Sequence, residues 1–138
     1  MTTIEIAQKF FQAFPAYPEY KEVSLGWIVG IPIHWKYKRL KYIAENSNIK
    51  ISEKPENLTY IGLEHIESKT GRLLLENQVE DVESTVSLFE KGDVLFGKLR
   101  PYLAKVVNPD FSGVCTTELL TLKPSQNTDG RFLSYQLL

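Results

Sequence analysis

Two cations and an aromatic ring alternate along one segment in the second half of the chain. After a turn and an apolar run, Lys98, Arg100 and Tyr102 occupy every second position. In a β-strand this spacing places the three side chains on one face. Cationic and aromatic side chains on a common face can contact a phosphate backbone and the edge of a base. Residues 91–105 are therefore predicted to form a DNA-binding surface.

Two further groups of side chains are candidates for the same chemistry. Residues 36–41 carry four positive charges in six positions, a density that suits either phosphate contact or an ordinary solvated face. The turn-rich segment 64–72 follows a short predicted strand, and loops held by strands often carry recognition residues, although its groups can also be ordinary solvated ones. Its candidates are His65, Lys69, Thr70 and Arg72. The residues predicted to bind DNA are Lys36, Lys38, Arg39, Lys69, Arg72, Lys98, Arg100, Tyr102 and Lys105.

The composition is that of a globular chain without a global charge bias. The 138 residues are 43% hydrophobic and 12% aromatic, which is enough for one hydrophobic core. Sixteen Lys and Arg oppose seventeen Asp and Glu, so the net charge of -1 favours neither nucleic acid nor an anionic membrane, and any attraction must be local. No segment has the pattern of a signal peptide or a membrane-spanning helix, which predicts a cytoplasmic protein.

The sequence offers little for catalysis or metal binding. Cys115 is the single cysteine and His34 and His65 are the two histidines, which excludes an intrachain disulfide and a zinc cluster of cysteine and histidine. No base stands at a recognisable spacing from Cys115, and an isolated cysteine usually packs as a small hydrophobic residue. We therefore expect no catalytic residue, no metal site and no cofactor. A small hydrolase that uses Cys115 with His34 or His65 is the least favoured of three alternatives.

The first part of the chain is predicted to contain a helix and an aromatic-rich loop. A capping-box pattern at residues 2–5 and apolar residues at helical spacing predict an amphipathic helix over 3–13. Two tryptophans, two glycines and a proline in 20–35 predict a loop in which Trp27 and Trp35 cover the core.

Short strands and a final helix are predicted in the remainder. Residues 104–107 and the alternating segment 114–122 are predicted to form a hairpin about the turn between them. Asp129 can cap a helix that begins near Gly130. Because the chain ends inside the apolar pattern of this helix, we expect a truncated chain or the N-terminal half of a longer one.

Four ordered sequence blocks resemble the specificity subunit of type I restriction-modification systems. They lie within residues 20–138, and the third is the most specific of them. The blocks are Trp27-x-x-Gly30-x-Pro32-x-His34-Trp35 with Arg39-Leu40-Lys41, Tyr60-Ile61-Gly62-Leu63-Glu64-x-Ile66 with Thr70-Gly71, Gly92-Asp93-Val94-Leu95-Phe96-Gly97-Lys98-Leu99-Arg100-Pro101-Tyr102-Leu103-x-Lys105-Val106, and Phe111-x-Gly113-x-Cys115-x-Thr117-Glu118.

The resemblance implies a target recognition domain, the module that recognises one half of a split DNA sequence. The implied fold is α/β (α+β), with a curved, mostly antiparallel mixed sheet and flanking helices, similar to the DNA-recognition domain of adenine methyltransferases. The implied organisation is an N-terminal helix and lead-in at 1–19, the recognition domain at 20–126 and the start of a spacer helix at 127–138. A complete specificity subunit has two such domains, separated by long helices.

The resemblance also implies the partners of the chain. They are double-stranded DNA, modification (methyltransferase) subunits and restriction subunits, and a homodimer of two half-subunits is left open. The implied role is recognition without catalysis. The alternative is a non-catalytic protein-assembly module that docks modification subunits and meets DNA only in the complex. The acidic segment 76–90 and the nearly neutral net charge favour this alternative.

The roles of individual residues in the third block are left open by the resemblance. Because this block is common to domains that recognise different sequences, it is expected to shape the domain more than to select a base. Lys98 and Lys105 are expected phosphate contacts, whereas Arg100 and Tyr102 either touch DNA or brace the fold from inside. Base recognition is expected outside the blocks, in parts of 46–58 and 67–85.

Overall fold

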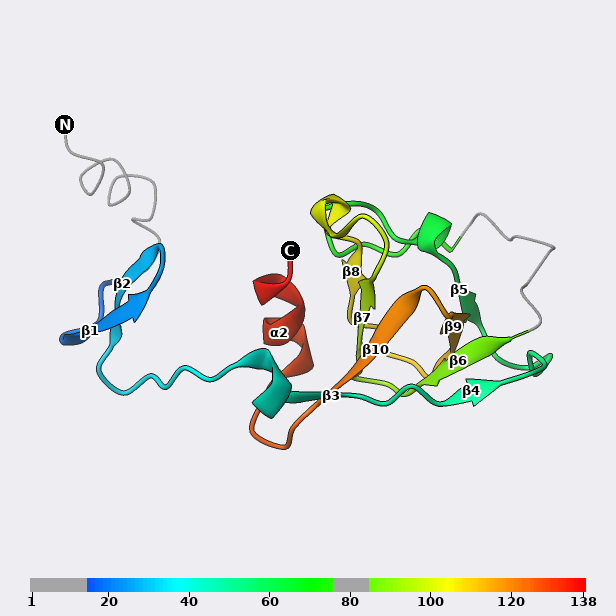
Figure 1. The fold of residues 1–138 in the computed structure, drawn as a ribbon, viewed down its shortest axis with the longest axis horizontal. Coiled ribbons are helices and arrows are strands. Elements are labelled where there is room, and N and C mark those ends of the chain that lie inside the picture. Colours follow the sequence, from blue (N-terminus) through cyan, green and yellow to red (C-terminus); the bar gives the residue numbers. More distant parts are fainter. Residues whose placement is uncertain (1–14, 76–84) are drawn as a thin grey trace. The chain divides into compact units, whose positions relative to one another are not determined.

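The computed structural model describes residues 15–75 and 85–138, which belong to two compact units, 1–37 and 38–138 (Figure 1). The helix predicted over 3–13 lies outside the described residues. Within the two described ranges, no helix is both long enough and apolar enough to cross a membrane.

The described part of the first unit is an antiparallel hairpin. Its strands are β1 (Tyr20–Leu25) and β2 (Ile28–Pro32), which pair with an irregularity between Glu22 and Leu25. Gly26 lies in the turn with a φ of 64°, a left-handed conformation that glycine adopts without steric cost. The prediction of a loop over 20–35 was therefore wrong. Gly26, one of the glycines that suggested a loop, forms the turn between the two strands.

The two tryptophans of this unit do not cover a core. Trp27, which follows the glycine of the turn, is 88% exposed, and Trp35 is 42% exposed. The ring of Tyr17 meets Trp35 edge-on, with 6.0 Å between the ring centroids. The prediction that both indoles are covering plates was wrong. Trp27 lies in the hairpin turn, where a side chain projects away from the strands, and Trp35 lies in the exposed segment after β2.

The second unit contains two four-stranded sheets and the helix α2 (Gly130–Gln136). The first sheet has the order β3 (Ala44–Asn46), β10 (Leu119–Pro124), β7 (Val94–Gly97) and β8 (Val106–Val107), and all of its neighbours are antiparallel. The second sheet has the order β4 (Lys50–Ile51), β6 (Val86–Phe89), β9 (Gly113–Thr116) and β5 (Tyr60–Ile61), with β5 and β9 parallel and the other pairs antiparallel.

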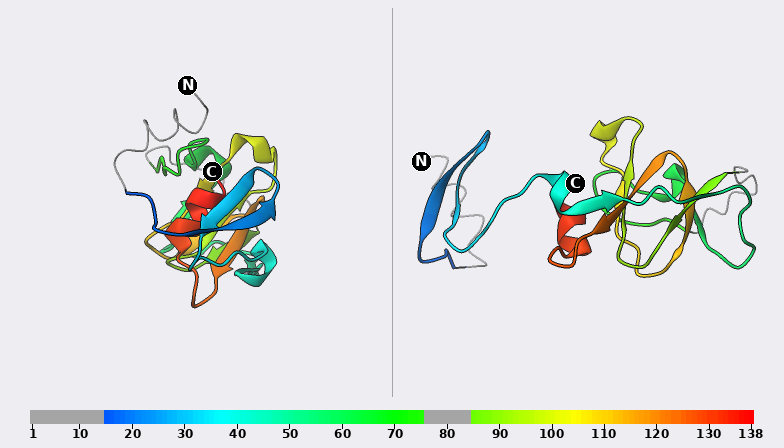
Figure 2. Two further views of the ribbon diagram at one scale, coloured as in Figure 1. Left: turned by 90° about the vertical axis from the view of Figure 1, so that its left-hand side faces the viewer. Right: turned by 60° about the horizontal axis from the view of Figure 1, so that its bottom comes forward.

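Alternating apolar residues bury the first sheet on both faces. Along β7, Val94 packs in a cluster with Leu133 of α2, whereas Leu95 packs in a cluster with Cys115 of β9. The two valines of β8 are divided between the same two clusters. The first sheet is thus a middle layer, with α2 (red) against one face and the second sheet against the other (Figures 1 and 2).

The last helix begins as its sequence predicts. Asp129 is the N-cap, and its Oδ1 accepts a hydrogen bond from the amide of Phe132 at 2.7 Å. The first helical residue is a glycine for a steric reason, because a Cβ on Gly130 would lie 2.4 Å from the carbonyl oxygen of Gly92. The helix therefore starts in close contact with the turn that precedes β7. Its role as a spacer helix stays a prediction.

The fold class predicted from the sequence is confirmed, since the structure is a mixed α/β fold with mostly antiparallel strands. The strands of the second unit divide into two sheets where one was expected. The hairpin predicted from 104–107 and 114–122 was wrong. A turn at Thr117 and Glu118 breaks the second segment into β9 and β10, which enter different sheets, and β8 pairs with β7.

Candidate nucleic-acid interface

The segment 98–105 leaves the sheet before its cations appear. Strand β7 ends at Gly97, and a 3-10 turn, η3 (Pro101–Leu103), follows. Arg100 and Ala104 flank this turn in left-handed conformations, with φ values of 50° and 44°. The prediction that Lys98, Arg100 and Tyr102 alternate along a strand was wrong, because Pro101 has no amide hydrogen to donate to a ladder and turns the chain out of the sheet.

All three of these side chains are nevertheless at the surface. Lys98 and Arg100 are exposed, and Tyr102 is 71% exposed. Among the described residues, neither Lys98 nor Arg100 has a side-chain hydrogen bond or an ion pair. The alternative in which Arg100 and Tyr102 brace the fold from inside was therefore wrong.

A second loop lies directly against this turn. Residues 66–73 form a narrow excursion closed by a bridge between Ile66 and Leu73. Lys69 and Gly71 turn the excursion with φ values of 62° and 72°. The amide of Lys69 donates to the carbonyl oxygen of Ala104 at 3.0 Å. Figure 1 shows the green segment after η2 (Leu63–His65) running beside η3.

Lys105 ties the second loop to the turn η2, which leads into the first loop. Its ammonium donates to the carbonyl oxygen of Leu63 at 2.7 Å. Gly97 fits into this contact without room to spare, because a Cβ there would lie 3.4 Å from both the Leu63 and the Lys105 side chains. The loops 66–73 and 98–105 thus form one surface, called here the two-loop surface. It carries Lys69, Arg72, Lys98, Arg100, Tyr102 and Lys105.

A carboxylate organises the first of these loops. Glu67 Oε2 accepts from Thr70 Oγ1 at 2.6 Å and from Arg72 Nε at 2.7 Å. The amide of Arg72 donates to Thr70 Oγ1 at 3.2 Å, and the amide of Glu67 donates to the Arg72 carbonyl oxygen at 3.0 Å. The hydrogen bond from Thr70, and then the one from Arg72, lowers the pKa of Glu67, which keeps this exposed carboxylate ionised.

His65 is not part of the exposed surface. It is 3% exposed, and its Nδ1 accepts a hydrogen bond from the amide of Gly62 at 2.9 Å. Its ring meets Tyr60 edge-on. The interpretation of His65 as a residue that recognises DNA was wrong, because it holds the turn η2 from inside.

Lys38 and Arg39 do not join the two-loop surface. Lys36 belongs to the first unit, whereas Lys38 and Arg39 belong to the second and precede the 3-10 turn η1 (Leu40–Tyr42). Along β10, Leu119 pairs with Gly97 near the two-loop surface, but Pro124 pairs with Ala44 just after η1. Lys38 and Arg39 therefore lie toward the opposite end of β10.

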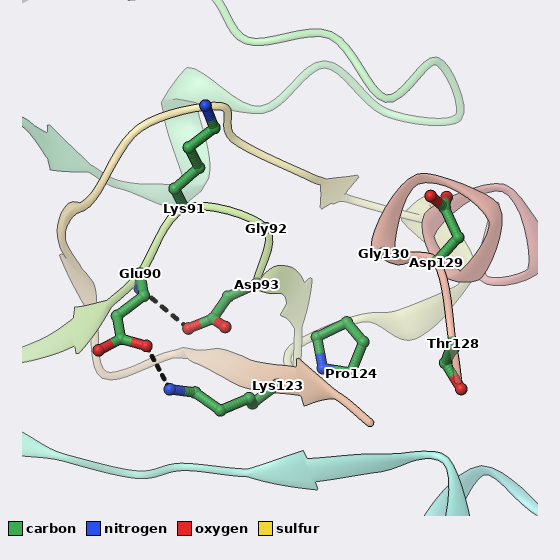
Figure 3. Close-up of a pocket in the computed structure, with 9 residues that line it drawn as sticks. All are labelled: Glu90, Lys91, Gly92, Asp93, Lys123, Pro124, Thr128, Asp129 and Gly130. Atoms are coloured by element: carbon green, nitrogen blue, oxygen red, sulfur yellow. Dashed lines mark hydrogen bonds and ion pairs between the residues drawn. The ribbon is translucent and has the colours of Figure 1, made fainter. Parts of the chain in front are cut away.

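That opposite end contains an open pocket that the sequence analysis did not find (Figure 3). It is lined by Glu90, Lys91, Gly92, Asp93, Lys123, Pro124, Thr128, Asp129 and Gly130. Asp93 Oδ2 accepts from the amide of Glu90 at 2.9 Å, and Glu90 forms an ion pair with Lys123. Burial raises the pKa of Asp93. Three carboxylates in the lining make the pocket unsuited to a phosphate group.

Cys115 has no features of a nucleophile. It is fully buried, and its Sγ lies 3.9 Å from Thr121 Oγ1. Burial raises the pKa of the thiol to about 11, so that the reactive thiolate is scarce at neutral pH.

Comparisons with known proteins agree with the motif blocks. No protein-family model matches the sequence. The fold is similar to that of a chain in a solved structure described as the structural basis underlying complex assembly and conformational transition of the type I R-M system. The TM-score is 0.55 with 18% identity, over 77% of this chain and 30% of that chain.

A curated protein gives the more specific likeness. The chain is 31% identical over 101 residues to the type I restriction enzyme EcoDI specificity subunit of Escherichia coli. The match covers 71% of this chain and 23% of that subunit, so the chain spans about a quarter of the length of this relative. The resemblance to type I specificity subunits predicted from the four blocks is confirmed.

Proposed function

We propose that the chain is a target recognition domain of a type I restriction-modification specificity subunit, and that it binds one half of a bipartite site in double-stranded DNA. The observation that carries the proposal is the two-loop surface, where loops distant in sequence are hydrogen-bonded to each other and present cations to solvent. The similarity to a specificity subunit supports DNA as the ligand of this surface.

The cations of the surface have different tasks. Lys69, Lys98 and Arg100 are exposed and have no side-chain partner among the described residues, so they are available to phosphate oxygens. Lys105 uses its ammonium to tie the second loop to η2 and acts mainly as a positioning residue. The role requires no chemistry from the chain itself. Methylation and cleavage belong to modification and restriction subunits that the chain directs.

The salt dependence of duplex binding tests this proposal. The chain is titrated onto a labelled duplex of random sequence by fluorescence anisotropy at several concentrations of salt. Three phosphate contacts predict a slope of about -3 in a plot of log K against log salt concentration. Binding that is absent at low salt, or that does not change when salt is raised fourfold, would contradict the proposal.

The second candidate is an assembly module, and the hairpin β1–β2 favours it. Trp27 is 88% and Val29 75% exposed, and large apolar groups at a surface often contact protein. As an assembly module, the chain would bind the modification subunit first and would contact DNA only within the complex. Co-purification of the modification subunit with a Trp27→Ser variant separates the candidates, because the assembly module loses its partner and the DNA-binding domain keeps its salt-dependent binding.

A further inference from the structure

The arginine of the first loop has a geometry that differs from that of the other surface cations. Arg72 donates through Nε to Glu67 Oε2, and its side chain is still 71% exposed. The terminal amino groups of the guanidinium have no partner among the described residues. The two terminal amino groups lie at the end of a planar guanidinium whose Nε is held by Glu67.

The loop fixes this arginine through its backbone as well as its side chain. The amide of Arg72 donates to Thr70, and its carbonyl oxygen accepts from the amide of Glu67. The Glu67 carboxylate is itself held by Thr70 at 2.6 Å. The loop is then fastened to the second loop through Lys69 and Ala104. A long side chain that is already ordered loses less conformational entropy when it binds a partner.

A held guanidinium fork suits a base more than a phosphate group. A guanine presents two acceptors, N7 and O6, in the major groove, and a bidentate arginine contact with them is the commonest specific contact to DNA. A phosphate contact needs charge and little orientation, which the flexible Lys69 and Lys98 provide. The position of Arg72 in 67–72 also agrees with the expectation that base recognition lies outside the motif blocks.

We propose that Arg72 recognises a guanine through its terminal amino groups, and that Glu67 is the positioning residue that aims it. The proposal rests on the proposed function, since it assigns base recognition within the same two-loop surface. Glu67 forms no contact with the DNA. Its effect on binding passes through the orientation of the guanidinium.

Selection and chemical substitution of the base test the proposal. The full chain selects its preferred sequence from a pool of random duplexes, and affinities are then measured with single positions changed. For the wild-type chain, one guanine is required, and replacing it by 7-deazaguanine, which lacks the N7 acceptor, weakens binding. The Arg72→Lys variant keeps the charge and loses the held fork, so its preference for that guanine falls by about 5- to 150-fold.

Two variants of the same loop distinguish the orientation of the Arg72 guanidinium from an effect of charge and from an effect on folding. Glu67→Gln replaces the ion pair that holds Arg72 with a neutral contact and is expected to reduce the same guanine preference. The thermal midpoint is expected to fall only slightly, because an ion pair this exposed contributes little to stability. Lys69→Ala, the matched control, lowers affinity for all sequences alike and reduces the salt slope by about 1.

The outcomes distinguish the inference from the proposed function. If Arg72→Lys keeps the guanine preference, or if Arg72→Ala weakens all sequences equally and reduces the salt slope, Arg72 is a phosphate contact and the inference is wrong while the DNA-binding function stands. If the wild-type chain shows no salt-dependent binding to any duplex, the proposed function fails and the inference falls with it.

Discussion

Polar side chains differ in hydrogen bonding between the two ends of strand β7. Before β7, Asp93 is 3% exposed and accepts from the amide of Glu90. Asn108 donates to the carbonyl oxygens of Gly92 and Asp93 at 3.0 Å each. These residues, with the ion pair of Glu90 and Lys123, form what is called here the turn cluster. Its polar groups are satisfied by the protein itself.

Beyond Gly97, in contrast, cationic side chains are exposed to solvent. Lys98, Arg100 and Lys69 are exposed and have no side-chain partner in the described part of the chain, and Arg100 is held in a left-handed conformation. Satisfied polar groups stabilise a fold, whereas strained and unpaired ones at a surface suggest a function. Under the proposed function, the turn cluster contributes stability and the two-loop surface binds DNA.

Removing the three unpaired cations is the strongest test of this assignment. The variant Lys69→Ala/Lys98→Ala/Arg100→Ala is expected to lose most of its DNA affinity, and its salt slope is expected to fall by about 3 because each cation releases about one counterion. Fluorescence anisotropy at several salt concentrations measures both. The unfolding midpoint is expected to change little, because the three side chains are exposed.

A charge-matched variant shows whether location matters. Lys38→Ala/Arg39→Ala/Lys41→Ala removes the same charge from residues at or just before η1, toward the opposite end of β10 from the two-loop surface. A smaller decrease in salt slope than in the first variant is expected. An equal decrease in the two variants would show that the comparison between the two ends is wrong.

Asn108→Ala tests the other side of the comparison. It removes two hydrogen bonds to backbone carbonyls in the turn cluster, which is expected to lower the free energy of unfolding by about 2 kcal/mol. The salt slope of DNA binding is expected to stay unchanged. Urea denaturation measures the first quantity, and Asn127→Ala, at an exposed position, serves as the control with a change within about 0.5 kcal/mol.

The fold class and the last helix could be predicted from the sequence, whereas the arrangement of the strands could not. The resemblance of the four blocks to type I specificity subunits predicted the mixed α/β fold. The cap at Asp129 located α2, because a helix cap is a local pattern. The division of the strands between two sheets could not be predicted. It depends on the turn at Thr117 and Glu118, two residues that carry no strong turn signal.

The candidate site shows the same limit. The sequence identified the cations of both loops, yet it placed Lys98, Arg100 and Tyr102 on a strand that ends at Gly97. The joining of the loops depends on long-range bonds from Lys69 and Lys105 to backbone oxygens, which no spacing reveals. The hydrogen bond between Arg72 and Glu67 could have been expected from the sequence. The two residues have opposite charges and are five positions apart, with a glycine between them.

Arg100 offers a way to separate backbone strain from charge. Arg100→Gly and Arg100→Ala both remove the guanidinium, so both are expected to reduce the salt slope by about 1. They differ in the backbone, because only glycine adopts the φ of 50° without steric cost. The glycine variant is expected to be more stable than the alanine variant by about 0.5–1 kcal/mol in urea denaturation. Equal stabilities would show that the turn does not store strain.

The smallest expected effect is a difference in pH dependence between the two carboxylates, Asp93 in the turn cluster and Glu67 in the two-loop surface. Burial raises the pKa of Asp93 above its ordinary value of 3.8, so the folded state binds its proton more tightly than the unfolded state. Its contribution to stability therefore increases as the pH falls through the raised pKa toward 3.8. Asp93→Asn removes this contribution.

Glu67 is expected to show the opposite sign. The hydrogen bonds from Thr70 and Arg72 lower its pKa below 4.5, so its contribution is present above pH 4.5 and is lost as the pH falls through the lowered pKa. Stability measured by urea denaturation from pH 3 to pH 7, for the wild type against Glu67→Gln and Asp93→Asn, gives the two dependences separately. If both variants change the pH dependence of the unfolding free energy in the same direction, the two carboxylates have similar environments. The contrast between the turn cluster and the two-loop surface then does not extend to these two residues.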